Sequence, residues 1–174
     1  EAPTYGCKIL SYQVRDVQRF PGRPEDLLRT LHREHGFHIL YLRRTNRLRH
    51  ALSNIRARRD TFHRKTSDPD AGARALPVDP EHVIEWMESS EALHAYEQTL
   101  LDDVPHLSLT YEEHIRHADA HQSTVDAICD YVGIASGPVE SSYQKTAPAS
   151  LRDRVANYDE LAARLAGTRY EPYL

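Results

Sequence analysis

The sequence has few cysteines and no long apolar run, and each scarcity excludes a class of protein. Its 174 residues include only two cysteines, Cys7 and Cys129, too few for the disulfide framework of a small secreted domain. No apolar stretch approaches the roughly 18 residues of a transmembrane helix. We therefore expect no membrane span, and the sparse cysteines and absence of a secretory signal favour a cytoplasmic location.

Metal-binding patterns are also missing. Neither cysteine stands in a C-x-x-C pair, and the eleven histidines are scattered without an H-E-x-x-H motif. We expect ordinary histidines and no metal. With 40% hydrophobic and 28% charged residues, the composition is typical of a globular protein, and the length suits one domain over residues 1–174.

Positive charge is concentrated in one segment. The net charge is −4, but residues 43–65 contain nine arginines and lysines against one acid, Asp60, which leaves −12 for the rest. An acidic chain with a single basic segment favours a local anion site over a nucleic-acid coat. A nucleic-acid interface would also need interleaved aromatic residues, and only Phe62 lies there. A solvated helix face is the alternative, and we expect Arg56, Arg58 and Arg59 to be solvated.

The pattern of elements predicts an α/β fold. Strands are expected over 7–14, 37–44 and 106–113, the second of them central and buried. Helices are expected over 24–35, from Asn46 onward, over 80–103, in the second part of 113–134 and from Ser150 to Gly167. The loops between them cover 64–79 and 135–149. Strands that alternate with helices predict a parallel sheet with helices on both faces.

A phosphate site is predicted where the second strand ends. "FHILYLRRTNRLRHALSNIRA" (37–57) places Arg43 and Arg44 at the carboxyl end of a strand, next to a helix that Asn46 caps. Helix N-termini and arginine forks both bind phosphate oxygens, and Ser53 would add a hydroxyl donor. Leu48 begins the apolar stripe of this helix, which continues through Leu52, Ile55 and Phe62. An arginine at a strand–helix junction is, however, a common feature without any ligand.

Four stretches in order resemble the sulfotransferase family, in its bacterial form. "LYLRRTNRLRHALSNIRA" is similar to the family's 3′-phosphate-binding segment, with Arg44 and Ser53 at the matching positions. "YGCKILSYQ" resembles the strand that precedes it, "HLSLTYEEH" the "YE" strand, and "QKTAPASLRDRVANYDELAARLAGTRYEPYL" the C-terminal tail. The match covers nearly the whole chain and corresponds to the C-terminal two-thirds of the family fold.

The resemblance implies an enzyme that moves a sulfuryl group from 3′-phosphoadenosine 5′-phosphosulfate (PAPS) to a hydroxyl or amine. Arg44 and Ser53 would hold the 3′-phosphate, Tyr111 would lie near the adenine, and Lys145 would reach the nucleotide. Lys8 would contact the transferring sulfuryl group as a catalytic cation. For Tyr111, Lys145 and Lys8, purely structural or solvated roles are the alternatives. The implied fold is a three-layer, P-loop NTPase-like parallel sheet.

The sequence departs from the family in its phosphate loop and its catalytic base. No G-x-x-x-x-G-K-[ST] or similar turn is present, so the fold is expected to be incomplete at its N-terminal end. A companion segment or a homodimer contact would then complete it. No residue is identified as the base. The acceptor, whether a small molecule, carbohydrate or lipid, is equally open, and a catalytically inactive nucleotide-binding or interaction module is the alternative function.

Overall fold

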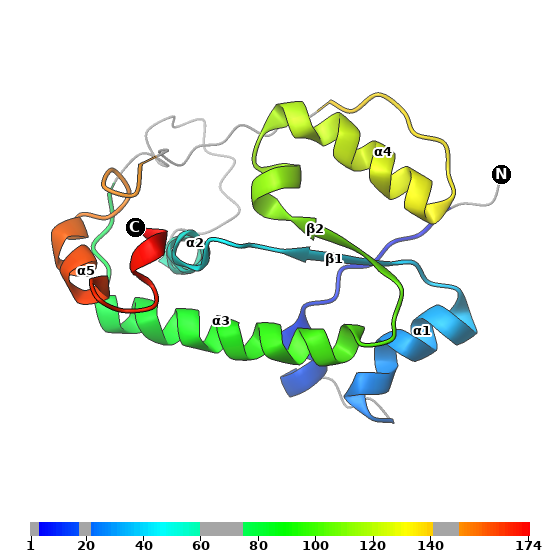
Figure 1. The fold of residues 1–174 in the computed structure, drawn as a ribbon, viewed down its shortest axis with the longest axis horizontal. Helices are drawn as coiled ribbons and strands as arrows, with labels where there is room; N and C mark the ends of the chain where they lie inside the picture. Colours follow the sequence, from blue (N-terminus) through cyan, green and yellow to red (C-terminus); the bar gives the residue numbers. More distant parts are fainter. Residues whose placement is uncertain (1–3, 18–21, 60–74, 141–149) are drawn as a thin grey trace. The chain divides into compact units, whose positions relative to one another are not determined.

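A computed structural model describes residues 4–17, 22–59, 75–140 and 150–174 (Figure 1). Five α-helices lie in these ranges: α1 (Leu27–His35), α2 (Arg47–Arg59), α3 (Pro80–Leu101), α4 (His121–Val132) and α5 (Tyr158–Leu165). The same ranges contain two strands, β1 (Ile39–Arg43) and β2 (His106–Thr110), which pair in parallel. The protein is therefore a mixed helix and strand structure with a small parallel sheet.

The chain divides into two compact units. The first comprises Glu1–Tyr41 and Glu91–Ser108, and the second comprises Leu42–Ser90 and Leu109–Leu174. The boundary falls within β1, β2 and α3, so α1 belongs to the first unit and α2, α4 and α5 belong to the second.

The second unit is built on an apolar cluster centred on α2. Leu48, Leu52 and Ile55 are buried, as the predicted stripe requires, whereas Phe62 lies outside the described residues. Full burial of a leucine or methionine stabilises a fold by about 1.5–3 kcal/mol, so this cluster dominates the stability of the unit. Ala51 of α2 is a further buried member, and the others come from α3, α5 and their flanking segments: Val78, Val83, Met87, Leu151, Val155, Leu161, Leu165 and Tyr170.

In the first unit, a polar network ties the N-terminal segment to α3. Glu97 accepts a hydrogen bond from the Tyr41 hydroxyl (2.6 Å) and another from Ser11 Oγ (2.5 Å). The Tyr41 oxygen also lies 2.8 Å from His94 Nδ1, and the two rings are stacked. The Glu97 carboxylate thus joins the N-terminal segment and β1 to α3.

Most predicted helix ends are confirmed, because local capping chemistry decides them. α1 follows a single 3-10 turn that starts at Pro24, and it ends at Gly36 with φ of 68°. Asn46 caps α2 through its side-chain oxygen, which accepts from Arg49 N at 2.8 Å. Gly133, with φ of 75°, closes α4 in the same left-handed conformation as Gly36.

The predicted strand over 7–14 is wrong. No strand forms there; instead, Gln13 N donates to Leu10 O and the Gln13 side chain accepts from Leu10 N. These two bonds close a turn that leads into the π-helical turn Gln13–Val17. The apolar residues before it remain exposed, Tyr5 at 85%. A β-favourable composition forms a strand only where a partner strand is available to it.

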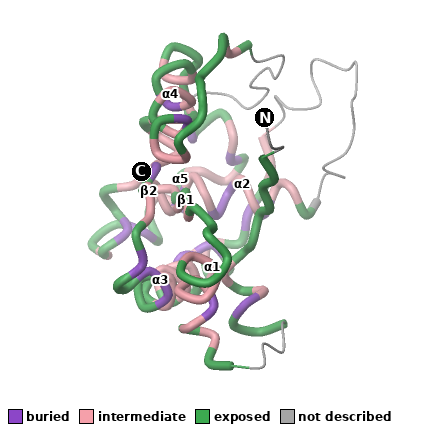
Figure 2. Tube along the Cα trace, turned by 90° about the vertical axis from the view of Figure 1, so that its right-hand side faces the viewer, coloured by how far each residue is buried: buried purple, intermediate pink, exposed green. Residues whose placement is uncertain are grey.

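The predicted burial of β1 is also wrong. The strand exists, but Leu40 and Leu42 are 43% and 53% exposed, and Figure 2 shows the exposed stretches of the trace. Among the described residues β1 pairs with β2 alone. β2 ends at Thr110, three residues early, because Thr110 caps the π-helical turn Tyr111–Ile115.

The final helix starts at Tyr158 instead of Ser150. Leu76 N donates to Arg154 O and Ala156 N donates to Leu76 O, so Leu76 and Val155 form a parallel bridge. The Asn157 side chain adds bonds to both Val78 N and Val78 O, at 2.9 and 2.8 Å. These tertiary pairings satisfy backbone groups that a longer helix would have used internally. The predicted loops 64–79 and 135–149 lie mostly outside the described residues.

Candidate anion-binding site

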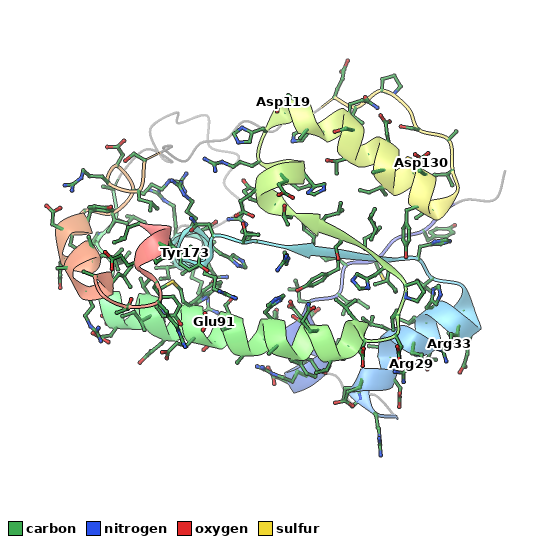
Figure 3. All side chains as sticks on the ribbon, viewed as in Figure 1. Arg29, Arg33, Glu91, Asp119, Asp130 and Tyr173 are labelled. Carbon is green, nitrogen blue, oxygen red and sulfur yellow. The ribbon has the colours of Figure 1, made fainter. Side chains whose placement is uncertain are left out.

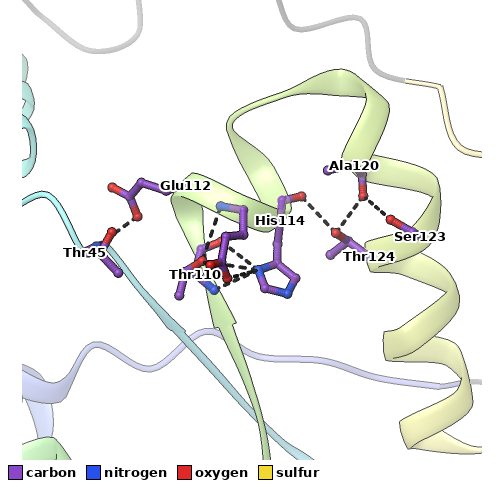
Figure 4. Close-up of polar contacts among 8 residues, drawn as sticks. Thr45, Thr110, Glu112, His114, Ala120, Ser123 and Thr124 are labelled. Carbon is purple, nitrogen blue, oxygen red and sulfur yellow. Dashed lines mark hydrogen bonds and ion pairs between the residues drawn. The ribbon is translucent and has the colours of Figure 1, made fainter.

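The candidate site is built in the second unit, around the junction of β1 and α2. Glu112 binds this junction through both carboxylate oxygens: Thr45 N donates to Oε2 at 2.9 Å and Asn46 N donates to Oε1 at 3.2 Å. Figure 4 shows Thr45 beside Glu112. Together with the Asn46 cap on Arg49 N, these bonds fix the backbone at the start of α2. The first turn of α2 is therefore joined to the turn that follows β2.

Glu112 is itself held by the turn that follows β2. Thr110 Oγ1 accepts from Glu113 N at 3.3 Å and caps the π-helical turn Tyr111–Ile115. At its far end the His114 carbonyl accepts from Thr124 Oγ1 of α4 at 3.0 Å (Figure 4). The turn is thus anchored at both ends.

The charge of Glu112 is stabilised in this position. Burial raises the pKa of its carboxyl group, but the hydrogen bonds from the Thr45 and Asn46 N–H groups outweigh burial and leave the pKa below its ordinary value. Glu112 is therefore ionised at neutral pH. It neutralises part of the positive field at the start of α2, so this backbone already has one anion of its own.

Arg44 and Tyr111 lie side by side at the same junction. The guanidinium carbon of Arg44 is 3.9 Å from the centre of the Tyr111 ring, a cation–π contact between two half-buried residues. Arg44 directly precedes Thr45 in the chain, and Tyr111 directly precedes Glu112, the residue to which Thr45 N donates. The structure therefore brings together these two predicted site residues.

Ser53 lies on a half-buried face of α2 with two arginines. Arg49, Ser53 and Arg56 are spaced by four and three residues, which places them on one side of a helix. All three are half-buried beside the buried stripe that begins at Leu48. The prediction that Arg56 is solvated is therefore wrong, whereas Arg58 is exposed as expected.

Arg47 has a structural contact at the beginning of α2. Its Nη1 donates to the Tyr173 hydroxyl at 3.0 Å, which joins α2 to the C-terminal turn Glu171–Tyr173. Figure 3 labels Tyr173 on this turn. The contact fixes the C-terminal end of the chain to the helix that carries the candidate site.

The described structure does not place the remaining predicted residues in this group. Lys8 is exposed and belongs to the first unit, and Lys145 lies outside the described residues. Sequence reasoning missed Arg116 and Arg154, both half-buried in the second unit. Neither stands in a recognisable motif, because tertiary contacts alone place them near α2.

Comparisons with protein-family models, curated proteins and solved structures found no match for this chain. In the ranges that the structure describes, no cluster of three histidine, cysteine or acidic side chains is arranged to hold a metal ion. The helices of those same ranges include none with the length and apolar character needed to cross a bilayer.

Proposed function

We propose that this chain binds a 3′-phosphorylated adenine nucleotide and serves sulfuryl transfer from PAPS to a hydroxyl or amine acceptor. The observation that carries the proposal is the contact of Arg44 with Tyr111 at the fixed start of α2, with Ser53 in the second turn of the same helix. These are three of the residues that the family resemblance implies for the nucleotide.

The residues suit a nucleotide phosphate chemically. Guanidinium groups bind phosphate oxygens through paired N–H donors, and a serine hydroxyl adds a further donor. The Tyr111 ring restricts the Arg44 guanidinium, so less side-chain freedom is lost when the phosphate binds. Glu112 keeps the backbone of the same junction in place.

The finer parts of the proposal rest on the resemblance alone. Lys8 would stabilise charge on the transferring sulfuryl group, and Lys145 would contact the nucleotide. The two-stranded parallel sheet would be part of a three-layer, P-loop NTPase-like sheet in a sulfotransferase-like domain. A companion segment would supply the loop that holds the phosphosulfate, and a companion segment or a homodimer contact would cover the exposed edge of the sheet.

Calorimetric titration with adenosine 3′,5′-bisphosphate, the desulfated nucleotide, tests the proposal. We expect micromolar binding by the native chain, about tenfold weaker binding for Arg44→Gln and a smaller loss for Ser53→Ala. The matched controls are Arg152→Gln and Ser89→Ala, which change exposed residues of the same unit. Native binding that neither site variant weakens would contradict the proposed site.

A turnover assay separates the enzyme from a catalytically inactive nucleotide-binding module. The alternative follows from the sequence, which contains no phosphate-loop motif. Release of adenosine 3′,5′-bisphosphate from PAPS, measured with and without acceptor alcohols and amines, distinguishes them. Acceptor-dependent release supports the transferase, whereas tight nucleotide binding without release supports the module.

A further inference from the structure

Three segments that are distant in the sequence contact one another, and each of them carries at least one arginine. The first is α2 itself, with Arg49 in its first turn and Arg56 two turns further along the same face. Because the Asn46 side chain accepts from Arg49 N, the position of Arg49 in the first turn is fixed. Both side chains are half-buried, so their charges act in a medium less polar than water.

The second segment is the turn that carries Glu112. Arg116 follows this turn directly, and its backbone N–H donates to Tyr111 O at 2.7 Å. Because Glu112 holds the same turn to Thr45 N and Asn46 N, Arg116 is fixed with respect to the start of α2. Arg116 is half-buried despite its charge.

The third segment is the stretch before α5. Leu151 and Val155 are buried in the same cluster as the apolar stripe of α2, and Leu76 pairs with the backbone on both sides of Val155. Arg154, immediately before Val155, is thereby fixed and half-buried in the same unit.

The positive charges of these four arginines act on one another. Burial, followed by the charges of Arg49 and Arg56, lowers the pKa of Arg154, and Arg116 contributes in the same direction. Burial and the charge of Arg116 lower the pKa of Arg49 as well. An anion that binds among these groups would offset their mutual repulsion.

We infer that Arg116 and Arg154 join Arg49 and Arg56 in binding a doubly charged phosphomonoester beside the α2 face that carries Ser53. The inference rests on the proposed function in that this group would be the 3′-phosphate of the nucleotide. A dianion suits the site because four arginines from three segments would share it, and each guanidinium group binds phosphate oxygens through paired N–H donors. Its second proton dissociates near pH 6, so binding weakens as the pH falls below that value.

The test titrates inorganic phosphate and adenosine 3′,5′-bisphosphate separately into the full chain and its variants. We expect Arg116→Gln and Arg154→Gln each to weaken the affinity for both ligands by about tenfold or more. The control Arg152→Gln removes an exposed arginine two positions from Arg154 and is expected to bind as the native chain does. Equal losses in Arg152→Gln and Arg154→Gln would overturn the inference, because net charge alone would then explain them.

A second measurement uses the native chain and so does not depend on variant folding. Arginine residues are modified with phenylglyoxal with and without phosphate, and the modified positions are read by peptide mass spectrometry. We expect phosphate to protect Arg116 and Arg154 and to leave Arg152 unprotected. Modification of Arg116 and Arg154 that phosphate does not change would overturn the inference.

The two ligands also separate this inference from the proposed function. If phosphate and bisphosphate bind with equal affinity, and both depend on Arg116 and Arg154, the anion site stands and the adenine nucleotide is the wrong ligand. If the bisphosphate binds without dependence on these arginines, the nucleotide proposal stands and the inferred site is wrong. If neither ligand binds, both are wrong.

Discussion

Among single residues, Glu112 has the largest effect on the geometry of the site. Its two oxygens accept from consecutive backbone N–H groups, Thr45 and Asn46, which precede the first turn of α2. A carboxylate in this position both orders the junction and removes part of its attraction for other anions. In the proposed site, the arginine side chains, and not the helix end, would therefore provide the binding energy for a phosphate.

Glu112→Gln tests this role through the pH dependence of stability. The folded-state pKa of Glu112 lies below its unfolded value, so its contribution is present above the unfolded pKa, near 4, and is lost as the pH falls through the folded pKa. We expect the variant to be less stable than the native chain by about 1–2 kcal/mol at pH 7, with the difference shrinking in acid. Urea unfolding from pH 7 to pH 3 measures it.

Glu140→Gln is the control, because Glu140 is exposed in the same unit. It is expected to have native stability throughout that pH range. A destabilisation by Glu112→Gln that stays constant down to pH 3 would show that the lost packing of the side chain, not its charge, is responsible.

At the scale of elements, the sequence predicts what local chemistry decides. Gly36, Asn46 and Gly133 mark helix ends correctly, because a left-handed residue or a side-chain cap acts within a few residues. The strand over 7–14 and the early start of α5 fail because their outcomes depend on distant partners. Whether Val155 enters a helix or a bridge is decided by Leu76, about 80 residues earlier.

The same division applies to the site. Arg44 and Ser53 can be predicted from the sequence because they belong to one strand–helix junction. Tyr111 can be predicted because it follows the next strand. Arg116 and Arg154 cannot be predicted from the sequence, because their positions depend on tertiary contacts. The turn after β2 positions Arg116, and the pairing with Leu76 positions Arg154.

Asn157→Ala tests the pairing that shortens α5. The Asn157 amide donates to Val78 O and its oxygen accepts from Val78 N, so it substitutes for a neighbouring strand. Loss of both bonds leaves two backbone groups of a buried residue without partners, and we expect a destabilisation of about 1–3 kcal/mol. Thermal unfolding followed by circular dichroism measures it. Asn157→Asp keeps the acceptor but loses the donor, so its thermal midpoint should lie below that of the native chain. A native midpoint for Asn157→Ala would contradict the role of Asn157.

At the scale of the whole molecule, charge is segregated. The net charge is −4, yet residues 43–65 carry +8, and two further arginines, Arg116 and Arg154, are fixed near α2. A negatively charged ligand is therefore attracted by one part of a molecule that otherwise repels it. Such attraction is sensitive to ionic strength, because salt shortens the range of charge interactions from about 10 Å at 0.1 M to about 3 Å at 1 M.

Salt titration tests this segregation. We expect the affinity for adenosine 3′,5′-bisphosphate to fall by roughly tenfold or more between low and high sodium chloride, while the thermal midpoint of the free chain does not fall. Arg154→Gln should show a shallower dependence of affinity on salt than the native chain, and Arg152→Gln the native dependence. An affinity that is insensitive to salt would mean that the binding does not depend on the arginines.

The contact between α2 and α3 includes a tryptophan that can serve as an intrinsic fluorescent probe. The single tryptophan, Trp86, meets the edge of the His50 ring of α2, with the ring centres 4.7 Å apart. Indole emission responds to the charge of a neighbouring imidazole and to the distance between the two rings. Because His50 directly follows Arg49 in the first turn of α2, a ligand that shifts this turn is expected to change the emission of Trp86. Unlabelled protein in a cuvette can thus be followed in real time by its intrinsic fluorescence.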